Sequence, residues 1–67
     1  MNKEELEHII SLTEGHIHRS AKQLRELIFS ENYNSPFIEE IIQETKIDLD
    51  ILLKAIRQYC QLQIEEQ

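Results

Sequence analysis

Apolar residues recur along the first half of the chain at the spacing of one face of an α-helix. With about 100° of rotation per residue, they fall within one stripe about 120° wide. The stripe consists of Leu6, Ile9, Ile10, Thr13, Ile17, Ala21, Leu24, Leu27 and Ile28. This pattern predicts one helix over residues 3–30. Two shorter helices that meet at residues 13–15 remain the alternative, because Gly15 can also end a helix.

A turn follows, and a second helix is expected to begin directly after it. The stretch SENYNSP, residues 30–36, contains Asn and Ser side chains that compete with the helix for backbone hydrogen bonds, and Pro36 has no N–H to donate. Ser35 is well placed to cap the next helix, with Pro36 at its first position. Glu39 and Glu40 lie near the positive end of its dipole. The sequence therefore predicts a helix that starts at Pro36.

The second segment carries a stripe of about the same width as the first. It consists of Ile38, Ile41, Ile42, Thr45, Leu49, Leu52, Leu53, Ile56, Cys60 and Gln63. Two amphipathic segments on either side of a short break predict an all-α helical hairpin of two long helices. No linker divides the chain, so residues 1–67 are expected to form a single small domain.

The second helix has one candidate break. ETKIDLDILLKAIRQY, residues 44–59, resembles a helix-turn-helix, in which a turn of the form T-x-I-[SD] buries an aliphatic residue and caps the next helix. Ile47 lies about 180° from the Ile38 stripe in a continuous helix, whereas a turn over Lys46–Asp48 would bury it. Lys46 stands where the motif has Gly, and Ile42 stands where it has a small residue. We predict a turn or distortion here, giving three helices, with a continuous helix as the alternative.

The size of the chain favours self-association. A chain of 67 residues with a single Cys has no internal disulfide, and so small a domain buries only about 60% of the surface of its unfolded form. We therefore expect a homodimer in a dimeric four-helix bundle, in which an apolar stripe of each helix faces the other hairpin. The predicted interface comprises Ile10, Ile17, Leu24, Ile28, Ile42, Leu49, Leu52 and Ile56.

Further apolar residues lie at the margins of the two stripes or outside them. They are Leu12, Phe29, Phe37, Ile47, Ile51, Ala55, Leu62 and Ile64. The single interface of a hairpin is too small to cover this second set. A second copy or a different protein is expected to bind it.

The charge distribution disfavours DNA reading by the helix-turn-helix-like stretch. The net charge is −6, and residues 31–67 hold three basic and eight acidic residues, a net of −5. Asp48 and Asp50 would meet DNA phosphates at the start of a recognition helix. The first half offers one candidate anion-binding or nucleic-acid-binding face, formed by His18, Arg19, Lys22 and Arg25. The chain resembles the Rop family of RNA-binding hairpin dimers in length and layout.

Catalytic, metal and cofactor sites are not expected. His16 and His18 point about 160° apart on a helix, and His8 and His16 about 80° apart, so no ligand cluster forms. Cys60 lies on the apolar stripe and is expected to be a buried, unreactive thiol. Glu39 and Glu40, like the other adjacent acids, point to different sides of a helix. We expect no enzymatic activity and no cofactor.

The expected location is the cytoplasm. No apolar run approaches the roughly 18 residues of a membrane span, and the N-terminus MNKEELEHII is charged where a signal peptide is apolar. A membrane partner is therefore not expected. The sequence predicts a small acidic interaction or regulatory protein that binds another protein through helical surfaces. A helical dimer that binds DNA or RNA is the alternative.

Overall fold

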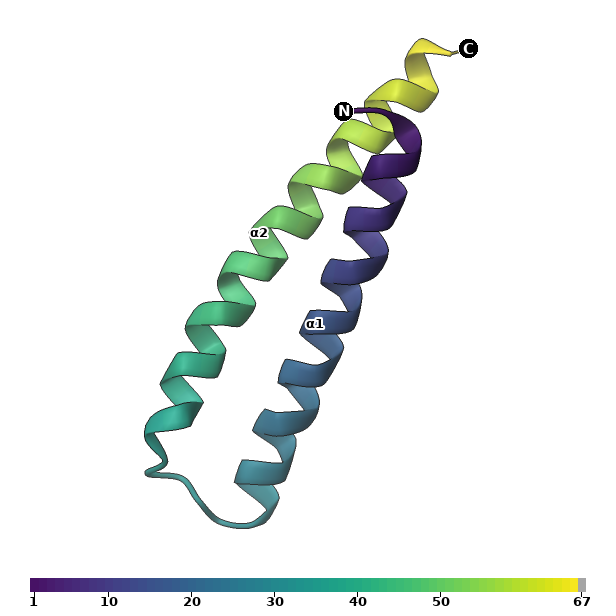
Figure 1. Cartoon of the computed structure of the whole chain (residues 1–67). Coiled ribbons are helices and arrows are strands. Elements are labelled where there is room, and N and C mark those ends of the chain that lie inside the picture. Colours follow the sequence, from purple (N-terminus) through teal and green to yellow (C-terminus); the bar gives the residue numbers. More distant parts are fainter. Residues whose placement is uncertain (67) are drawn as a thin grey trace.

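The computed structural model describes residues 1–66, which form two antiparallel α-helices joined by a short turn (Figure 1). Helix α1 spans Lys3–Phe29 and helix α2 spans Pro36–Glu65. The hairpin measures 51 × 14 × 14 Å, with both termini at one end. No strand occurs in the described residues, so the predicted all-α helical hairpin is confirmed.

Helix α1 begins with a reciprocal cap and continues without interruption to the turn. The side chain of Asn2 accepts a hydrogen bond from the backbone N–H of Glu5 at 2.8 Å, and the Glu5 carboxylate accepts one from the backbone N–H of Asn2 at 3.5 Å. These bonds satisfy two of the free donors at the helix start. The helix passes through Gly15, which confirms one helix rather than two.

Replacing Gly15 with alanine is expected to stabilise the fold by about 0.5–1 kcal/mol, because Gly loses more backbone freedom on folding. A Cβ atom at this position meets only Arg19 Nη1, at 3.9 Å, which is an ordinary van der Waals distance. Urea unfolding of Gly15→Ala and the wild type measures the difference. A loss of stability would show that Gly15 is required for a closer contact at this point of the helix.

Helix α2 begins where the sequence predicts. The Ser35 hydroxyl accepts a hydrogen bond from the backbone N–H of Phe37 at 3.3 Å, and Pro36 occupies the first helical position. In the preceding turn, Glu31 has a φ of 62°, and the N–H of Asn32 donates to the carbonyl of Leu27 at 2.9 Å. That bond closes the end of α1.

The predicted break near Lys46–Asp48 is wrong, because α2 is continuous through these residues. Ile47 is 62% exposed rather than buried. A turn would break backbone hydrogen bonds and would require a left-handed residue where Lys46 stands. Burial of one Ile contributes only about 1.5–3 kcal/mol, so it does not compensate for these costs.

The buried faces of both helices recur every three to four residues, with an average spacing close to 3.5. On α1 they comprise Leu6, Ile10, Thr13, Ile17, Ser20, Leu24 and Leu27, and on α2 Ile38, Ile41, Thr45, Asp48, Leu52, Ala55, Tyr59 and Leu62. The predicted α2 stripe is thus partly wrong, since Leu49, Leu53, Ile56 and Cys60 are exposed. A straight helix drifts by about 20° per seven residues from a 3.5-residue spacing, and α2 is long enough for this drift to move the buried face.

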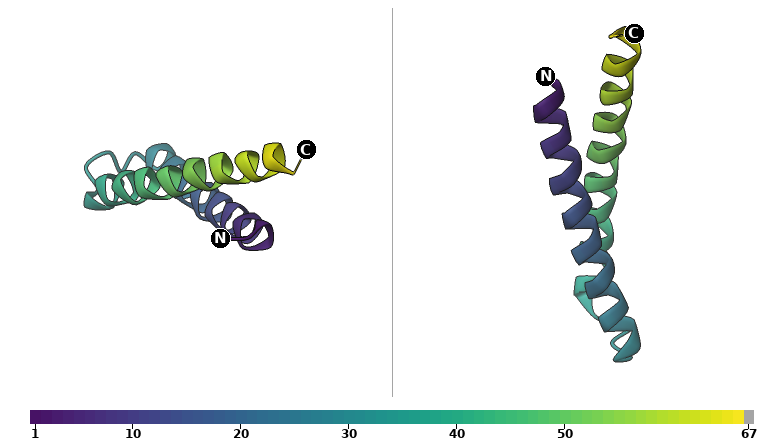
Figure 2. Two further views of the ribbon diagram at one scale, coloured as in Figure 1. Left: turned by 90° about the horizontal axis from the view of Figure 1, so that it is seen from above. Right: turned by 90° about the vertical axis from the view of Figure 1, so that its right-hand side faces the viewer.

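The core between the two helices is thin. Leu6 and Ala55, at 1% and 5% exposure, are the buried apolar residues, while Thr13 and Ser20 are buried polar ones. The Thr13 hydroxyl donates to the carbonyl of Ile9 at 2.6 Å, within its own helix. Figure 2 shows that the axes of the two antiparallel helices are inclined to each other, so that the helices cross. Much of the apolar surface of the hairpin therefore lies outside the contact between α1 and α2.

Candidate interaction surfaces

The hairpin exposes more surface than a compact protein of its mass. Its accessible area is 5436 Å², at a mass of 8.0 kDa. The scaling of area with mass gives about 4450 Å² for a compact monomer of this size, so the excess is on the order of 1000 Å². Among the residues that the structure describes, twelve large apolar side chains are exposed, and several of them lie on two faces of the hairpin.

The structure divides the predicted dimer interface into two groups. Ile10, Ile17, Leu24, Ile42 and Leu52 are half-buried, at or beside the contact between α1 and α2. Ile28, Leu49 and Ile56 are 48%, 45% and 39% exposed. The second group is therefore available to another molecule.

A shallow groove lies between α1 and α2 on one side of the hairpin. It has a volume of about 180 Å³ and its lining includes Ile9 of α1 and Ile51 of α2. Leu12 follows Ile9 by three positions, and Ile47 precedes Ile51 by four, so each pair lies on one side of its helix. We call the surface formed by Ile9, Leu12, Ile47 and Ile51 the Ile47 face.

The opposite side carries a second apolar surface. Glu7 and Leu49 each precede a groove residue by two positions, a rotation of about 200°, so both lie on the other flank of the hairpin. The Tyr59 hydroxyl donates to Glu7 Oε1 at 2.9 Å on this flank. We call the surface formed by Ile28, Ile42, Leu49, Leu53, Ile56 and Cys60 the Leu49 face. Its free Cys60 is exposed, which corrects the expectation of a buried thiol.

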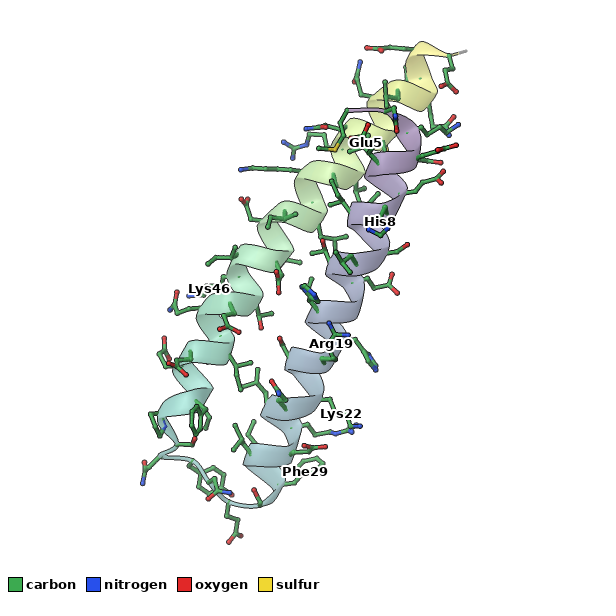
Figure 3. All side chains as sticks on the ribbon, in the orientation of Figure 1. Glu5, His8, Arg19, Lys22, Phe29 and Lys46 are labelled. Carbon is green, nitrogen blue, oxygen red and sulfur yellow. The ribbon has the colours of Figure 1, made fainter. Side chains whose placement is uncertain are left out.

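The predicted basic residues all lie on the exposed surface of α1. His18, Lys22 and Arg25 line a shared hollow of about 430 Å³ together with Ala21. Figure 3 shows Arg19 and Lys22 projecting from α1 away from α2. Helical geometry turns Arg19 about 120° away from Arg25, so the four residues do not converge on one point. The lining contains the basic side chains of His18, Lys22 and Arg25 and no carboxylate, so the hollow can attract an anion.

Polar contacts between the helices define their register. His16 Nδ1 lies 4.0 Å from Asp48 Oδ1, and Lys3 Nζ lies 3.4 Å from Glu66 Oε2 and 5.8 Å from the centre of the Tyr59 ring. The sequence-based stripes missed Asp48 and Tyr59, because they counted apolar residues at a spacing of about 3.6. A seven-residue spacing relates both to other buried residues: Tyr59 to Ile38, Thr45 and Leu52, and Asp48 to Ile41, Ala55 and Leu62.

Another groove, of about 380 Å³, lies between the helices at the turn end. It is lined by Gln23, Glu26, Leu27, Ser30, Phe37 and Ile41, so Glu26 is its one titratable group. Catalysis by acid and base usually requires several positioned titratable groups. This groove therefore lacks the paired groups that such chemistry uses.

Within residues 1–66, no three His, Cys, Asp or Glu side chains lie close enough together to hold a metal ion. Neither helix in the described part of the chain has the length and apolarity needed to cross a membrane. Comparison of the chain with protein-family models, curated proteins and solved structures finds no match. The two apolar faces and the basic hollow are thus the surface features that another molecule can bind.

Proposed function

We propose that the protein is a small acidic, non-enzymatic regulatory protein that acts in the cytoplasm as a homodimer and binds another protein through its helical surfaces. The observation that carries the proposal is the exposed apolar area on both flanks of the hairpin. Leu49 and Ile56 on one flank are 45% and 39% exposed, and Ile47 and Leu12 on the other are 62% and 52% exposed. Apolar faces of this kind are typical of surfaces that bind other proteins.

The homodimer accounts for the first of these faces. A standard protein interface buries about 800 Å² per partner, close to the excess of about 1000 Å² that this hairpin exposes. Two hairpins that meet through their Leu49 faces form a four-helix arrangement with a shared apolar interior. The thin core between α1 and α2 gives this association a direct role in stability.

The second face remains available for a different protein. Glu44 and Glu40 precede Ile47 by three and seven positions, so they border the turn-side end of this face on α2. Lys54, which is paired with Asp50 at 3.0 Å, lines the groove at its other end. With a net charge of −5 over residues 31–67, this half of the chain complements a basic protein surface. We propose that the partner presents an apolar patch bordered by Lys and Arg.

Affinity capture from the native host, followed by mass spectrometry, tests this function. The Ile47→Asp variant should lose a dominant protein partner that the wild type retains, because it places a carboxylate within the apolar face. Ile64→Asp is the matched control, since Ile64 is 66% exposed near the end of α2 and away from this face. Circular dichroism confirms that both variants fold. Equal capture by Ile47→Asp and the wild type would exclude the Ile47 face as the binding surface.

Nucleic-acid binding is the second candidate function, supported by the hollow that His18, Lys22 and Arg25 line. The face predicted from sequence also includes Arg19. A net charge of −6 opposes phosphate binding elsewhere on the molecule. Mobility-shift titrations with DNA and RNA at low salt distinguish the two functions. Binding that is lost when Arg19, Lys22 and Arg25 are changed to Gln would replace the protein-binding proposal with this one.

A further inference from the structure

We infer that the second copy binds the Leu49 face in one particular orientation. In it, α1 packs antiparallel to α1 of the second copy and α2 packs antiparallel to α2, about a two-fold axis perpendicular to the long axis of the hairpin. The inference rests on the proposed homodimer and specifies its geometry. Charge complementarity along α1, apolar matching along α2 and the register of the hairpin each support it.

The flank of α1 beside the Leu49 face has a self-complementary charge pattern. Its exposed residues, at intervals of three and four positions, are Glu4, Glu7, Ser11, Glu14, His18, Ala21, Arg25 and Ile28. The carboxylates of Glu4, Glu7 and Glu14 lie in the first half of this series. His18 and Arg25 lie in the second half. Antiparallel pairing about residue 16 places Glu7 opposite Arg25 of the second copy and Glu14 opposite His18. A two-fold interface requires this kind of self-complementarity, and each pair then occurs twice.

Helix α2 has a matching arrangement of apolar residues. Ile42, Leu49 and Ile56 are seven positions apart and lie on one flank of the helix. Antiparallel pairing about Leu49 places Leu49 against its own copy and Ile42 against Ile56 of the second copy. Two residues exposed at 45% and 39%, Leu49 and Ile56, become buried in this way.

The two centres of pairing lie at the same height in the hairpin. His16 Nδ1 is 4.0 Å from Asp48 Oδ1, so residue 16 of α1 is level with the residue before Leu49 in α2. One two-fold axis at this level therefore relates both helices to their copies. The register comes from contacts within the hairpin, so it is independent of the charge pattern and of the apolar pattern.

The other two-fold arrangement of the same faces stacks α1 on α2 of the second copy, and it pairs the groups poorly. The hydrogen bond from Tyr59 to Glu7, at 2.9 Å, shows that Glu7 is level with Tyr59. In that arrangement Glu7 meets Ile56 and Cys60 of the second copy, so its carboxylate is desolvated without a cation. His18 meets Lys46 of the second copy rather than a carboxylate. The antiparallel α1–α1 orientation avoids both contacts. Its own pairing of a carboxylate with an apolar residue, Glu4 with Ile28 of the second copy, lies at the two ends of the α1–α1 contact, where water reaches the carboxylate.

Disulfide cross-linking tests the orientation directly. In a Cys60→Ser background, Leu49→Cys provides one thiol at the two-fold axis, and Ile47→Cys provides one on the opposite face. Disulfides form only when the two Cα atoms come within about 7 Å. Mild oxidation should convert most of the Leu49→Cys chain into a covalent dimer and leave Ile47→Cys uncoupled. A covalent dimer of Ile47→Cys alone would overturn the assignment of the Leu49 face.

A charge exchange tests the pairing of Glu7 with Arg25. Either Glu7→Arg or Arg25→Glu alone should raise the dimer dissociation constant about tenfold, since a two-fold axis turns two attractions into two repulsions. The double variant should regain wild-type affinity. Arg19→Glu, which makes the same charge change away from the interface, should leave affinity within about twofold.

The outcomes separate the orientation from the dimer itself. Rescue by the double variant supports the antiparallel α1–α1 pairing. A dimer in which the double variant stays as weak as the single variants has a different orientation, while the proposed homodimer stands. A wild-type chain with a monomeric mass at all concentrations removes both the orientation and the homodimer.

Discussion

The Leu6→Ala variant is expected to lose a large part of the stability of the hairpin. Leu6 is 1% exposed and is the largest fully buried side chain in the described residues. Truncating a buried Leu to Ala costs about 2–5 kcal/mol. At about 0.05–0.15 kcal/mol per residue, a chain of this length has only about 3–10 kcal/mol of stability. The loss is therefore a large fraction of the total.

Leu12→Ala is the matched control for this change. It removes the same atoms from the same helix, but Leu12 is 52% exposed. Its stability should stay within about 0.5 kcal/mol of the wild type. Far-UV circular dichroism measures the helical content, and it follows the unfolding of both variants in urea. Equal losses for Leu6→Ala and Leu12→Ala would show that the contact between α1 and α2 is not the main source of stability.

Leu49→Asp is expected to convert the homodimer into a monomer. Leu49 is 45% exposed in the hairpin, so the contact between α1 and α2 tolerates a polar group there. In the proposed dimer the side chain is buried beside its own copy, and the variant places two carboxylates in an apolar interior. Because dimerisation newly buries only the exposed 45% of each Leu49 side chain, losing both apolar contacts alone raises the dissociation constant about ten- to a hundredfold.

Light scattering measures the mass of the wild type and the variant. Thermal melts over about a hundredfold range of protein concentration measure how the melting temperature depends on association. The melting temperature of the wild type should rise with concentration, because association stabilises the folded chain. Leu49→Asp should have a monomeric mass and a lower, concentration-independent melting temperature. Ile64→Asp, at a position 66% exposed, should behave like the wild type. A wild-type melting temperature that does not change with concentration would contradict the coupling of folding to dimerisation.

Local signals in the sequence determined the helices and the turn between them. Ser35 and Pro36 define the start of α2, because a capping hydroxyl and a residue without an N–H act within one turn of the backbone. Gly15 does not interrupt α1, because a single Gly costs a long helix only about 1 kcal/mol. The same periodicity also predicted Ile28, Leu49 and Ile56 as interface residues, and the structure leaves all three exposed.

Only the tertiary structure decided which face of each helix is buried. The crossing of α1 and α2 imposes a spacing of about 3.5 residues, which brings Asp48, Ala55 and Tyr59 to the contact and turns Leu53 and Cys60 outward. It also decided that Ile47 is exposed in a continuous α2. Short-range preferences do not contain this information, because the rotation of a long helix about its axis is set by the helix against which it packs.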